Sequence, residues 1–348
     1  MGKRLTICLV NDTFLKGRGV DNVIHNLAKR LGKKHEVYVM AGETNIIPEN
    51  FKFVKLPIGK LFTGGLKDFL YFKKMKELGD FIWDFDLKNN IDVYNVHHVG
   101  LATAFKDFPL NTIYTWHGSP PSNNPARKFI VNYFNKKLKG ENTICISDYL
   151  SVKAYELGTK SEQVIDEGCD TKKFKPTWED KNFMLYVGRL EKHKHVEKVI
   201  RVANELNFSL KIVGYGTQED YLKMYAKKNK KIQFLGRVSN KKLIELYQQC
   251  SFFISASEWE CFGLIFLEAG CCGKPSVLYR IKEMPNFIDN GKTGLIAKNY
   301  EEFKSYANLL IEFPPIRKRM GKQAYNKYKK YSWDKTANEY EKCLMESL

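Results

Sequence analysis

The sequence lacks an apolar run long enough to cross a membrane. A membrane-spanning helix needs about 20 consecutive apolar residues, and the first apolar stretch, residues 5–10, is too short even for the core of a signal peptide. The eight cysteines contain no CxxC pair and no regular spacing, so neither a disulfide framework nor a zinc site is indicated. These absences predict a cytoplasmic protein with reduced thiols.

Acidic residues are few relative to basic ones. The chain has 57 Lys and Arg against 39 Asp and Glu, which gives a formal net charge of +18. Such an excess indicates an anionic partner, which can be nucleic acid, an anionic lipid surface or a phosphorylated substrate. Charge alone does not choose among these three.

Apolar segments alternate with helical patterns through both halves of the chain. Val20, Val23, Ile24, Leu27 and Leu31 recur at helical spacing, directly after the apolar stretch at 5–10. Strands that are apolar throughout and separated by helices predict parallel sheets covered on both faces. The expected strands are 5–10, 35–40, 51–56, 93–96, 112–117 and 143–147, then 183–187, 210–213, 232–235, 252–256 and 276–279.

A length of 348 residues suits two domains of about 150 to 200 residues each. The fold class expected is therefore α/β, with two doubly wound Rossmann-like domains facing across a cleft. We place the first domain at 1–168, the second at 177–325, and a helix crossing back to the first domain at 326–348. Ligands of open parallel sheets bind beyond the carboxyl ends of the strands, so functional residues should follow strands.

One strand-to-helix loop in the second half carries two cations. Arg189 and Lys194 follow the expected strand 183–187 and precede a helix that starts near Val196. Helix amino ends offer free amides and positive partial charge, so this loop suits a diphosphate. The alternative is that both are ordinary solvated charges.

The next loop, Ile212-Val-Gly-Tyr-Gly, has glycines at 214 and 216 that permit a tight turn. The third glycine of a GxGxxG dinucleotide fingerprint is missing, which argues against hydride transfer.

Two carboxylates bracket the apolar run that begins at Phe262. Glu260 stands just before it, and Glu268 lies within it, where its desolvation needs an offset. Gly263 leads into a helix whose first amides can hold a phosphate oxygen, and Glu268 can accept hydrogen bonds from two vicinal hydroxyls of a ribose. The alternative is a structural salt bridge for Glu268 and a surface position for Glu260.

The first half has two comparable sites. Gly17-Arg-Gly19 precedes the helix at Val20 and lets the backbone approach a ligand closely. His117 and Gly118 end the strand expected at 112–117, which leaves an imidazole at the cleft, although a lone histidine is often structural. The pair His97 and His98 is similar and less specific.

Taken in order, these motifs resemble the large family of retaining glycosyltransferases with the GT-B fold, group 1 or family 4. The stretch EWECFGLIFLEAGCCGKPSV is similar to the family pattern EGFGLxxLEAMACGxPVV. Further similar motifs are the GRL that starts at Gly188, IVGYG, FLGRVS, DNGKTGL, TWHG, CISDY and GCDTKKF, and a closing helical tail. The chain departs from the family at Gly17-Arg-Gly19, at His195, where glycine is common, and at Met284-Pro-Asn286, and these departures leave the donor open.

The resemblance implies a role for each matching position. Arg189 and Lys194 would hold the diphosphate of a UDP- or GDP-linked sugar, Glu268 its ribose, and Glu260 its sugar. Gly19 and the backbone of Phe262, Gly263 and Leu264 would contact phosphate and sugar, Gly214 would line the donor site, and Val238 would border the base. His117 would lie beside the transferred sugar and, with Glu260, Arg189 and Lys194, form the catalytic set. The resemblance implies neither a cofactor nor a metal, because the two cations supply the positive charge that an ion supplies elsewhere.

The activity implied is that of a retaining glycosyltransferase of hexosyltransferase type. Its hydroxyl acceptor would be a glycan or lipid-linked intermediate of cell-surface polysaccharide or glycolipid synthesis. Residues 51–76 interleave lysines with aromatic side chains, and basic residues at 127, 128, 136, 137 and 139 continue the pattern. This suits peripheral contact with the anionic inner face of the cell membrane, and equally suits an amphipathic helix with a solvated basic face.

Rival interpretations of the sequence assign the chain other activities. A nucleotide-sugar epimerase would use the same architecture, whereas a phosphorylase would need a pyridoxal-binding lysine signature that is not found. A nucleic-acid-binding protein would use the basic run 223–242 and would have no need of Glu260 or Glu268. We therefore expect no nucleic-acid partner.

Overall fold

The structure is a computed structural model that describes residues 3–58, 71–118, 125–226, 229–260, 262–281 and 288–348. Residues 59–70 of the basic-aromatic segment 51–76 lie outside these residues, as do Cys261 and Met284-Pro-Asn286. The side chains of Arg127 and Lys128 likewise lie outside the description.

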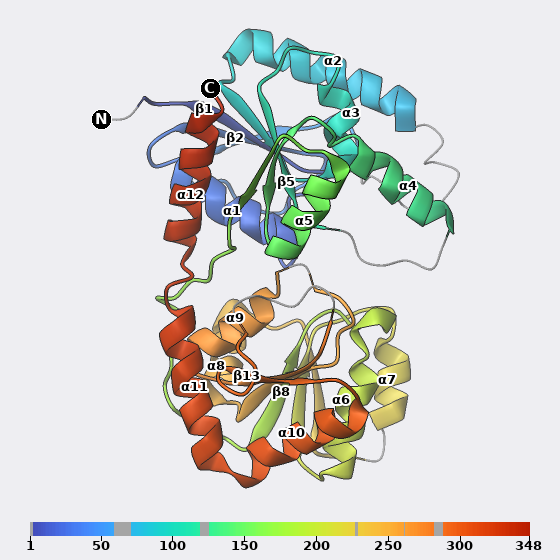
Figure 1. Cartoon of the computed structure of the whole chain (residues 1–348), viewed down its shortest axis with the longest axis vertical. Helices are drawn as coiled ribbons and strands as arrows, with labels where there is room; N and C mark the ends of the chain where they lie inside the picture. The colour runs from blue at the N-terminus through green and yellow to red at the C-terminus, as the bar shows by residue number, and fades with distance from the viewer. Residues whose placement is uncertain (1–2, 59–70, 119–124, 227–228, 261, 282–287) are drawn as a thin grey trace. The chain divides into compact units, whose positions relative to one another are not determined.

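The chain divides into two units (Figure 1). The N-terminal unit comprises Met1–Glu167 together with Trp333–Leu348, and the C-terminal unit comprises Gly168–Ser332. The chain therefore leaves the N-terminal unit after Glu167 and re-enters it at Trp333. The sequence predicted the end of the first domain at 168 and the start of the returning helix at 326.

The N-terminal unit is built on a seven-stranded parallel sheet with the order β3-β2-β1-β4-β5-β6-β7. Its strands are β1 (Thr6–Val10), β2 (Glu36–Ala41), β3 (Lys52–Lys55), β4 (Val93–Val96), β5 (Thr112–Trp116), β6 (Asn142–Cys145) and β7 (Ser161–Val164). Its helices are α1 (Gly19–Leu31), α2 (Tyr71–Asn89), η2 (Val99–Leu101), α3 (Ala102–Phe105), α4 (Pro125–Lys136), α5 (Asp148–Leu157) and α12 (Trp333–Glu346).

The C-terminal unit has a six-stranded parallel sheet with the order β10-β9-β8-β11-β12-β13. Its strands are β8 (Phe183–Val187), β9 (Ser209–Val213), β10 (Ile232–Gly236), β11 (Phe252–Ser255), β12 (Ser276–Tyr279) and β13 (Gly294–Ala297). Its helices are η3 (Lys192–Lys194), α6 (Val196–Glu205), α7 (Glu219–Ala226), α8 (Asn240–Gln249), α9 (Leu264–Cys271), α10 (Tyr300–Glu312) and α11 (Pro314–Tyr328).

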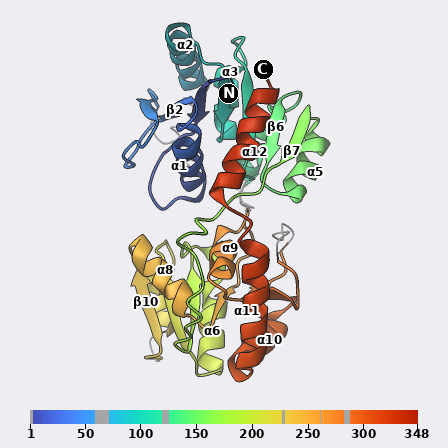
Figure 2. The ribbon, with the colours of Figure 1, turned by 90° about the vertical axis from the view of Figure 1, so that its left-hand side faces the viewer.

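The central strands are buried, as expected for sheets with helices on both faces (Figure 2). The α/β class with two doubly wound, Rossmann-like domains is thus confirmed, and the fold is GT-B. In each sheet the strand order reverses once, between β1 and β4 in the first and between β8 and β11 in the second. These switch points are where open parallel sheets bind ligands.

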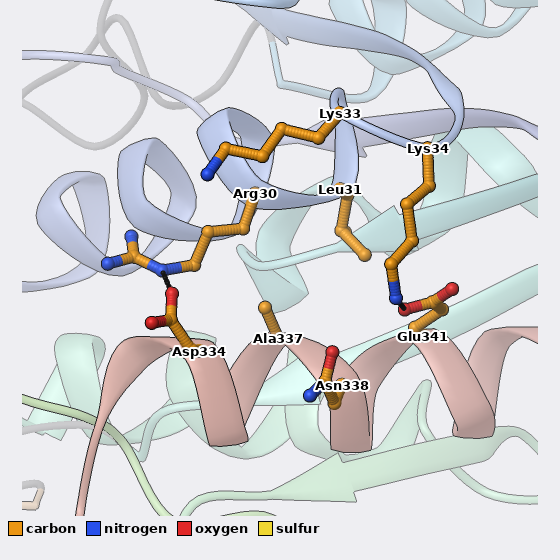
Figure 3. A pocket seen from close by; sticks show the side chains of 8 residues that line it. All are labelled: Arg30, Leu31, Lys33, Lys34, Asp334, Ala337, Asn338 and Glu341. Atoms are coloured by element: carbon orange, nitrogen blue, oxygen red, sulfur yellow. Dashed lines mark hydrogen bonds and ion pairs between the residues drawn. The ribbon is translucent and has the colours of Figure 1, made fainter.

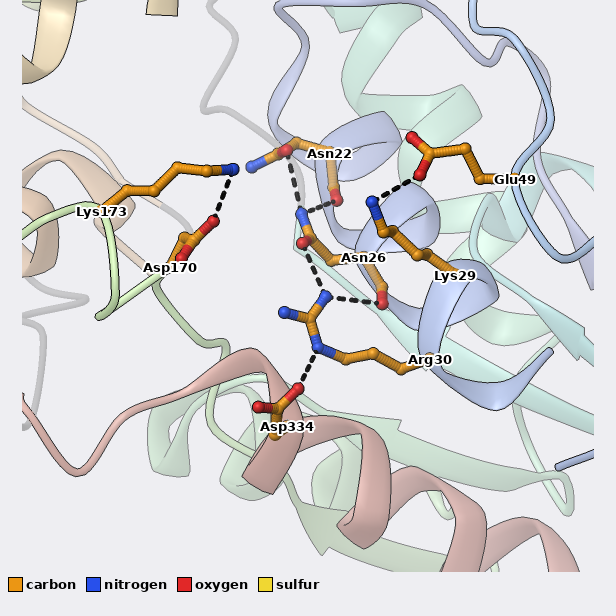
Figure 4. A network of polar contacts seen from close by, with 8 residues as sticks. All are labelled: Asn22, Asn26, Lys29, Arg30, Glu49, Asp170, Lys173 and Asp334. Carbon is orange, nitrogen blue, oxygen red and sulfur yellow. Dashed lines mark hydrogen bonds and ion pairs between the residues drawn. The ribbon is translucent and has the colours of Figure 1, made fainter. Parts of the chain in front are cut away.

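Helix α12 completes the N-terminal unit. It buries Trp333, Tyr340 and Leu344 and runs beside α1 (Figure 3). Arg30 Nε lies 2.6 Å from Asp334 Oδ1, and Lys34 Nζ lies 2.7 Å from Glu341 Oε2. Figure 4 shows that Arg30 also donates from Nη1 to the side-chain oxygen of Asn26, at 2.9 Å. Apolar burial and peripheral ion pairs together attach the last helix to α1.

Candidate functional site

The loops after β8 and β11 meet at the switch point of the C-terminal sheet. The two strands are neighbours in that sheet, so their following loops leave the same edge. The amide of Glu258 donates to the carbonyl of His193 at 3.0 Å, which ties the β11 loop to η3. Arg189 and Lys194 on one loop and Glu260 on the other are thereby brought together.

Lys194 and Glu260 form a largely buried ion pair. Lys194 Nζ lies 2.8 Å from Glu260 Oε1, with side-chain exposures of 10% and 12%. Lys194 Nζ also donates to the carbonyl of Trp259 at 3.2 Å, and Ser257 Oγ donates to that same carbonyl at 2.8 Å. Lys194, which the resemblance assigns to the diphosphate, and Glu260, which it assigns to the sugar, therefore pair with each other. A donor would bind beside this pair of opposite charges.

Arg189 lies at the surface and has no ion-pair partner among the residues that the structure describes. Its backbone is fixed, because the buried Tyr186 hydroxyl donates to the Arg189 carbonyl at 3.1 Å. An exposed guanidinium on a fixed backbone is available to an anion without breaking an existing contact.

Two histidines flank Lys194. His195 has a left-handed backbone (φ 47°), lies 2.8 Å from Glu197 through Nδ1 and 3.0 Å from Glu258 through Nε2. The contact with Glu197 raises the pKa of His195, with a further contribution from Glu258. Burial lowers the pKa of His193, and the charges of Lys194 and Arg189 lower it further. His195 thus joins the β11 loop to the start of α6.

The glycines at 214 and 216 allow two loops to pack backbone to backbone. A Cβ at Gly214, whose φ is 137°, would lie 1.8 Å from the carbonyl oxygen of Gly188, and one at Gly216 would lie 2.4 Å from that of Leu190. This packing explains both glycines without a ligand. The role of Gly214 in donor binding stays a prediction.

Helix α9 starts at the same edge of the sheet. Gly263 is its N-cap with a left-handed backbone (φ 90°), and no side-chain hydrogen bond caps this helix end. Phe262 is buried, and Leu264 is partly exposed. The N-cap glycine has no side chain to occupy the first amides of α9, and amides at a helix start can bind an anion.

Glu268, one turn into α9, has no cationic partner among the described residues, so the alternative of a structural salt bridge is not realised there. Burial raises the pKa of Glu268 to about 7, and the neighbouring Tyr247 hydroxyl opposes that shift. Tyr247, from α8, packs between Phe253 and Phe174. Burial therefore disfavours the ionised form of this carboxylate, and hydrogen-bond donors placed beside it would favour that form.

The loop after β10 adds a feature that sequence reasoning missed. Arg237 stacks over the ring of Tyr215, with 3.9 Å between the guanidinium carbon and the ring centroid. The partly exposed Val238 follows directly. The stack leaves no local pattern in the sequence, because Tyr215 and Arg237 lie 22 residues apart and are brought together by the pairing of β9 with β10.

In the N-terminal unit the loop after β1 is fixed by a buried carboxylate that the sequence did not single out. Asp21 accepts hydrogen bonds from Asn11 Nδ2 at 2.8 Å, Thr13 Oγ1 at 3.1 Å and the amide of Leu15 at 2.7 Å. Burial raises the pKa of Asp21 to about 6. A Cβ placed on Gly19 would meet no atom of the described residues within 4 Å.

His117 lies at the carboxyl end of β5 and is 5% exposed. Its Nε2 lies 2.9 Å from His97 Nδ1, and its Nδ1 lies 3.3 Å from Glu167 Oε1. Sequence reasoning ranked the pair at 97 and 98 below His117 and did not consider Glu167. The structure joins His97, His117 and Glu167 in one row.

Metal ligation and membrane spanning find no support in the described residues. They contain no group of three or more His, Cys, Asp or Glu side chains placed to hold a metal ion. In the part of the chain that the structure describes, no helix is both long and apolar enough to cross a membrane.

Several cations of the basic run 223–242 have local partners. Lys223 pairs with Glu219 at 2.7 Å, Lys242 pairs with Glu245 at 3.1 Å, and Lys231 Nζ donates to the carbonyl of Asn207 at 2.8 Å.

Comparisons with known proteins support the class indicated by this site. Residues 169–327 match the family model described as glycosyl transferases group 1. An uncharacterized glycosyltransferase of Methanocaldococcus jannaschii is 27% identical over 240 residues, which are 67% of this chain and 66% of that relative. The match thus spans just under two thirds of the relative's length.

Solved structures agree on the fold. A sucrose-phosphate synthase from Thermosynechococcus elongatus superposes with a TM-score of 0.84 at 15% identity and 99% coverage of both chains. The Anabaena protein HepE, solved in complex with UDP-glucose, superposes with a TM-score of 0.78 at 14% identity, covering 99% of this chain and 100% of that one. The fold is therefore GT-B, and the family match supports a glycosyltransferase of group 1.

Proposed function

We propose that this protein is a retaining glycosyltransferase of hexosyltransferase type, which moves a sugar from a UDP- or GDP-linked donor to a hydroxyl acceptor. The observation that carries the proposal is the grouping of Arg189, Lys194 and Glu260 at the switch point between β8 and β11. The family match over residues 169–327 supports it.

The proposed donor site assigns each group by its charge. Arg189, which has no ion-pair partner in the part of the chain that the structure describes, binds the diphosphate together with the amino end of α9, and Lys194 adds a second cation. Glu268 accepts hydrogen bonds from the vicinal hydroxyls of the ribose, which offsets the desolvation of its carboxylate. Glu260 contacts the donor sugar, and Val238 with the Arg237–Tyr215 stack borders the base.

The reaction follows from the charge that develops when the bond from sugar to phosphate breaks. The sugar becomes positive and the nucleoside diphosphate leaves as an anion, so cations fixed at the diphosphate stabilise the transition state more than the ground state. In the family that the sequence resembles, the acceptor attacks the same face that the leaving group departs from. We propose that outcome here, with His117 beside the transferred sugar.

For the acceptor we propose a glycan or a lipid-linked intermediate at the anionic inner face of the cell membrane. The net charge of +18 supports such a surface. Flotation with vesicles of neutral lipid and with vesicles containing anionic lipid tests it: the protein should float only with the anionic ones. Equal flotation with both would contradict the membrane part while leaving the transferase part untouched.

The activity itself is tested by incubating the protein with UDP-glucose, the donor bound by HepE, and with other UDP- and GDP-sugars. One donor should release its nucleoside diphosphate, and nuclear magnetic resonance of the nascent sugar should show the donor's anomeric configuration. Release with inverted configuration would contradict retention. Epimerised nucleotide sugar without release would replace the transferase by an epimerase.

A further inference from the structure

Three buried titratable side chains form a row in the N-terminal unit. Glu167, His117 and His97 are 5%, 5% and 4% exposed, respectively. His97 follows β4, and His117 follows β5, its neighbour in the sheet, while Glu167 lies three residues beyond the end of β7. All three therefore lie toward the carboxyl edge of the sheet, where ligands of such sheets bind.

The chemistry of the contacts fixes the protons along the row. A carboxylate only accepts hydrogen bonds, so the His117 Nδ1 that faces Glu167 Oε1 at 3.3 Å carries a proton. When His117 is neutral its second nitrogen accepts, and in that state His97 Nδ1, 2.9 Å from His117 Nε2, is the donor of that bond. His97 Nε2 is left without a proton.

Two further observations agree with this assignment. His97 Nε2 is buried and has no hydrogen-bond partner among the described residues, which an unprotonated nitrogen tolerates better than a charged N–H. Burial lowers the pKa of His97 well below its usual value, which favours a neutral ring. The groups around the row are Tyr340 of α12, whose ring lies nearly parallel to that of His97, and His98 and Asp12.

We propose that Glu167 and His97 are positioning residues for His117: Glu167 holds the proton on Nδ1, and His97 holds the ring through Nε2. With both nitrogens engaged, His117 has one tautomer and one orientation. What that orientation does for sugar transfer rests on the proposed function, whereas the tautomer itself does not.

The tautomers are observable in the intact protein, which has only seven histidines. Long-range proton–nitrogen correlation spectra of the ¹⁵N-labelled full chain, assigned with His97→Gln and His117→Gln, should show both rings protonated at Nδ1 only. In Glu167→Gln, His117 should lose its single tautomer, because an amide both donates and accepts. A wild-type His117 protonated at Nε2 would overturn the proposal, as would a spectrum that Glu167→Gln leaves unchanged.

Kinetics then distinguish positioning from a merely structural role. Glu167→Gln should lower kcat about tenfold and change the donor KM by less than about twofold, since orientation and not binding is lost. Glu167→Asp, which keeps the carboxylate, should recover part of kcat. Glu141→Gln is the matched control. Glu141 directly precedes β6, at the amino edge of the same sheet and away from the row, and it pairs with Lys106. The kcat of this variant should equal that of the wild type.

Equal kcat in Glu167→Gln and wild type would contradict the proposal. If Glu167→Gln does not fold, the wild-type spectrum and the kinetics of Glu167→Asp decide. If the wild type transfers no sugar at all, the proposed function fails, and the spectra still test the row.

Discussion

At the scale of single residues, the two carboxylates around α9 differ in how their charge is compensated. Glu260 has the ammonium of Lys194 at 2.8 Å, whereas no described cation pairs with Glu268. The sequence predicted that something must offset the desolvation of Glu268. Among the described residues the neighbouring Tyr247 does so in part, and in the donor complex that we propose the ribose hydroxyls would add to it.

This difference predicts a pH dependence of donor binding. Burial raises the pKa of Glu268 to about 7, so the free protein is partly protonated there at neutral pH. Ligand hydroxyls favour the ionised form, so binding releases a proton, and affinity for UDP-glucose should rise roughly tenfold from pH 6 to pH 8. Calorimetry in buffers of different ionisation enthalpy measures both quantities.

Glu268→Gln is the control for that dependence, and it should bind weakly at both pH values. The same substitution should also stabilise the fold. Because the folded-state pKa lies above the usual value, ionisation of Glu268 costs stability as pH rises from about 4.5 to 7. The free energy of unfolding at pH 8 should therefore be about 1 to 3 kcal/mol higher in Glu268→Gln. Stronger binding at pH 6, or a less stable variant at pH 8, would contradict this assignment.

The pair of Lys194 and Glu260 predicts a non-additive double substitution. Removing one member of a largely buried pair leaves the other charge uncompensated, so Lys194→Met and Glu260→Gln should each lower the free energy of unfolding by about 3 kcal/mol. The double variant should lose much less than the sum of the two. Denaturant titrations measure this, and additive losses would show that the ion pair does not couple the loops.

At the scale of elements, the loops after β8 and β9 depend on close backbone contact. Gly214→Ala should be strongly destabilising, by more than about 3 kcal/mol, because its Cβ would lie 1.8 Å from a backbone oxygen. Gly236→Ala is the matched control: its φ is also positive, at 58°, but no atom lies within 4 Å of the added Cβ. Its cost should be about 1 kcal/mol, from backbone strain alone. Similar thermal midpoints for both variants would contradict the packing argument.

The central elements were predictable because burial leaves a pattern in the sequence. The expected strands at 183–187 and 276–279 coincide with β8 and β12, whose residues are almost all buried. Sequence reasoning missed β7 and β13, which are the last strands of their sheets. An edge strand has one neighbour and needs fewer apolar residues, as the polar Ser-Glu-Gln-Val of β7 shows. This reason does not apply to β13, whose Gly-Leu-Ile-Ala is apolar and buried.

Part of the candidate site was also predictable from the sequence. Arg189, Lys194 and Glu260 follow strands, so the rule for parallel sheets indicated them from their places in the sequence. That Lys194 and Glu260 pair with each other was not predictable, because 65 residues of chain separate Lys194 from the Trp259 carbonyl that it also contacts. Asp21, in the first turn of α1, and Glu167, beyond the end of β7, were missed because a single carboxylate carries no period or motif that marks its burial.

At the scale of the whole molecule, the chain crosses between its two units twice, and helix α12 returns to the first unit. Trp333, Tyr340 and Leu344 are buried in that unit, and Asp334 pairs with Arg30. A chain ending at Ser332 should therefore lose stability in the N-terminal unit and keep it in the C-terminal unit. Hydrogen exchange of the shortened chain would show faster exchange in β1, β4 and β5, with β8 and β11 unchanged. Uniformly faster exchange would contradict this division.

The chemistry proposed for this protein depends on a C-terminal unit that binds a nucleoside diphosphate through Arg189 and Glu268. Calorimetric titration with UDP, GDP and ADP tests that binding, on the wild type, Arg189→Ala, Glu268→Ala and the control Arg201→Ala, whose arginine pairs with Glu205 on α6. One nucleotide should bind, and the first two substitutions should each weaken it by about tenfold or more, with the control unchanged. If no nucleotide binds, or if all four proteins bind alike, the donor site proposed here is wrong.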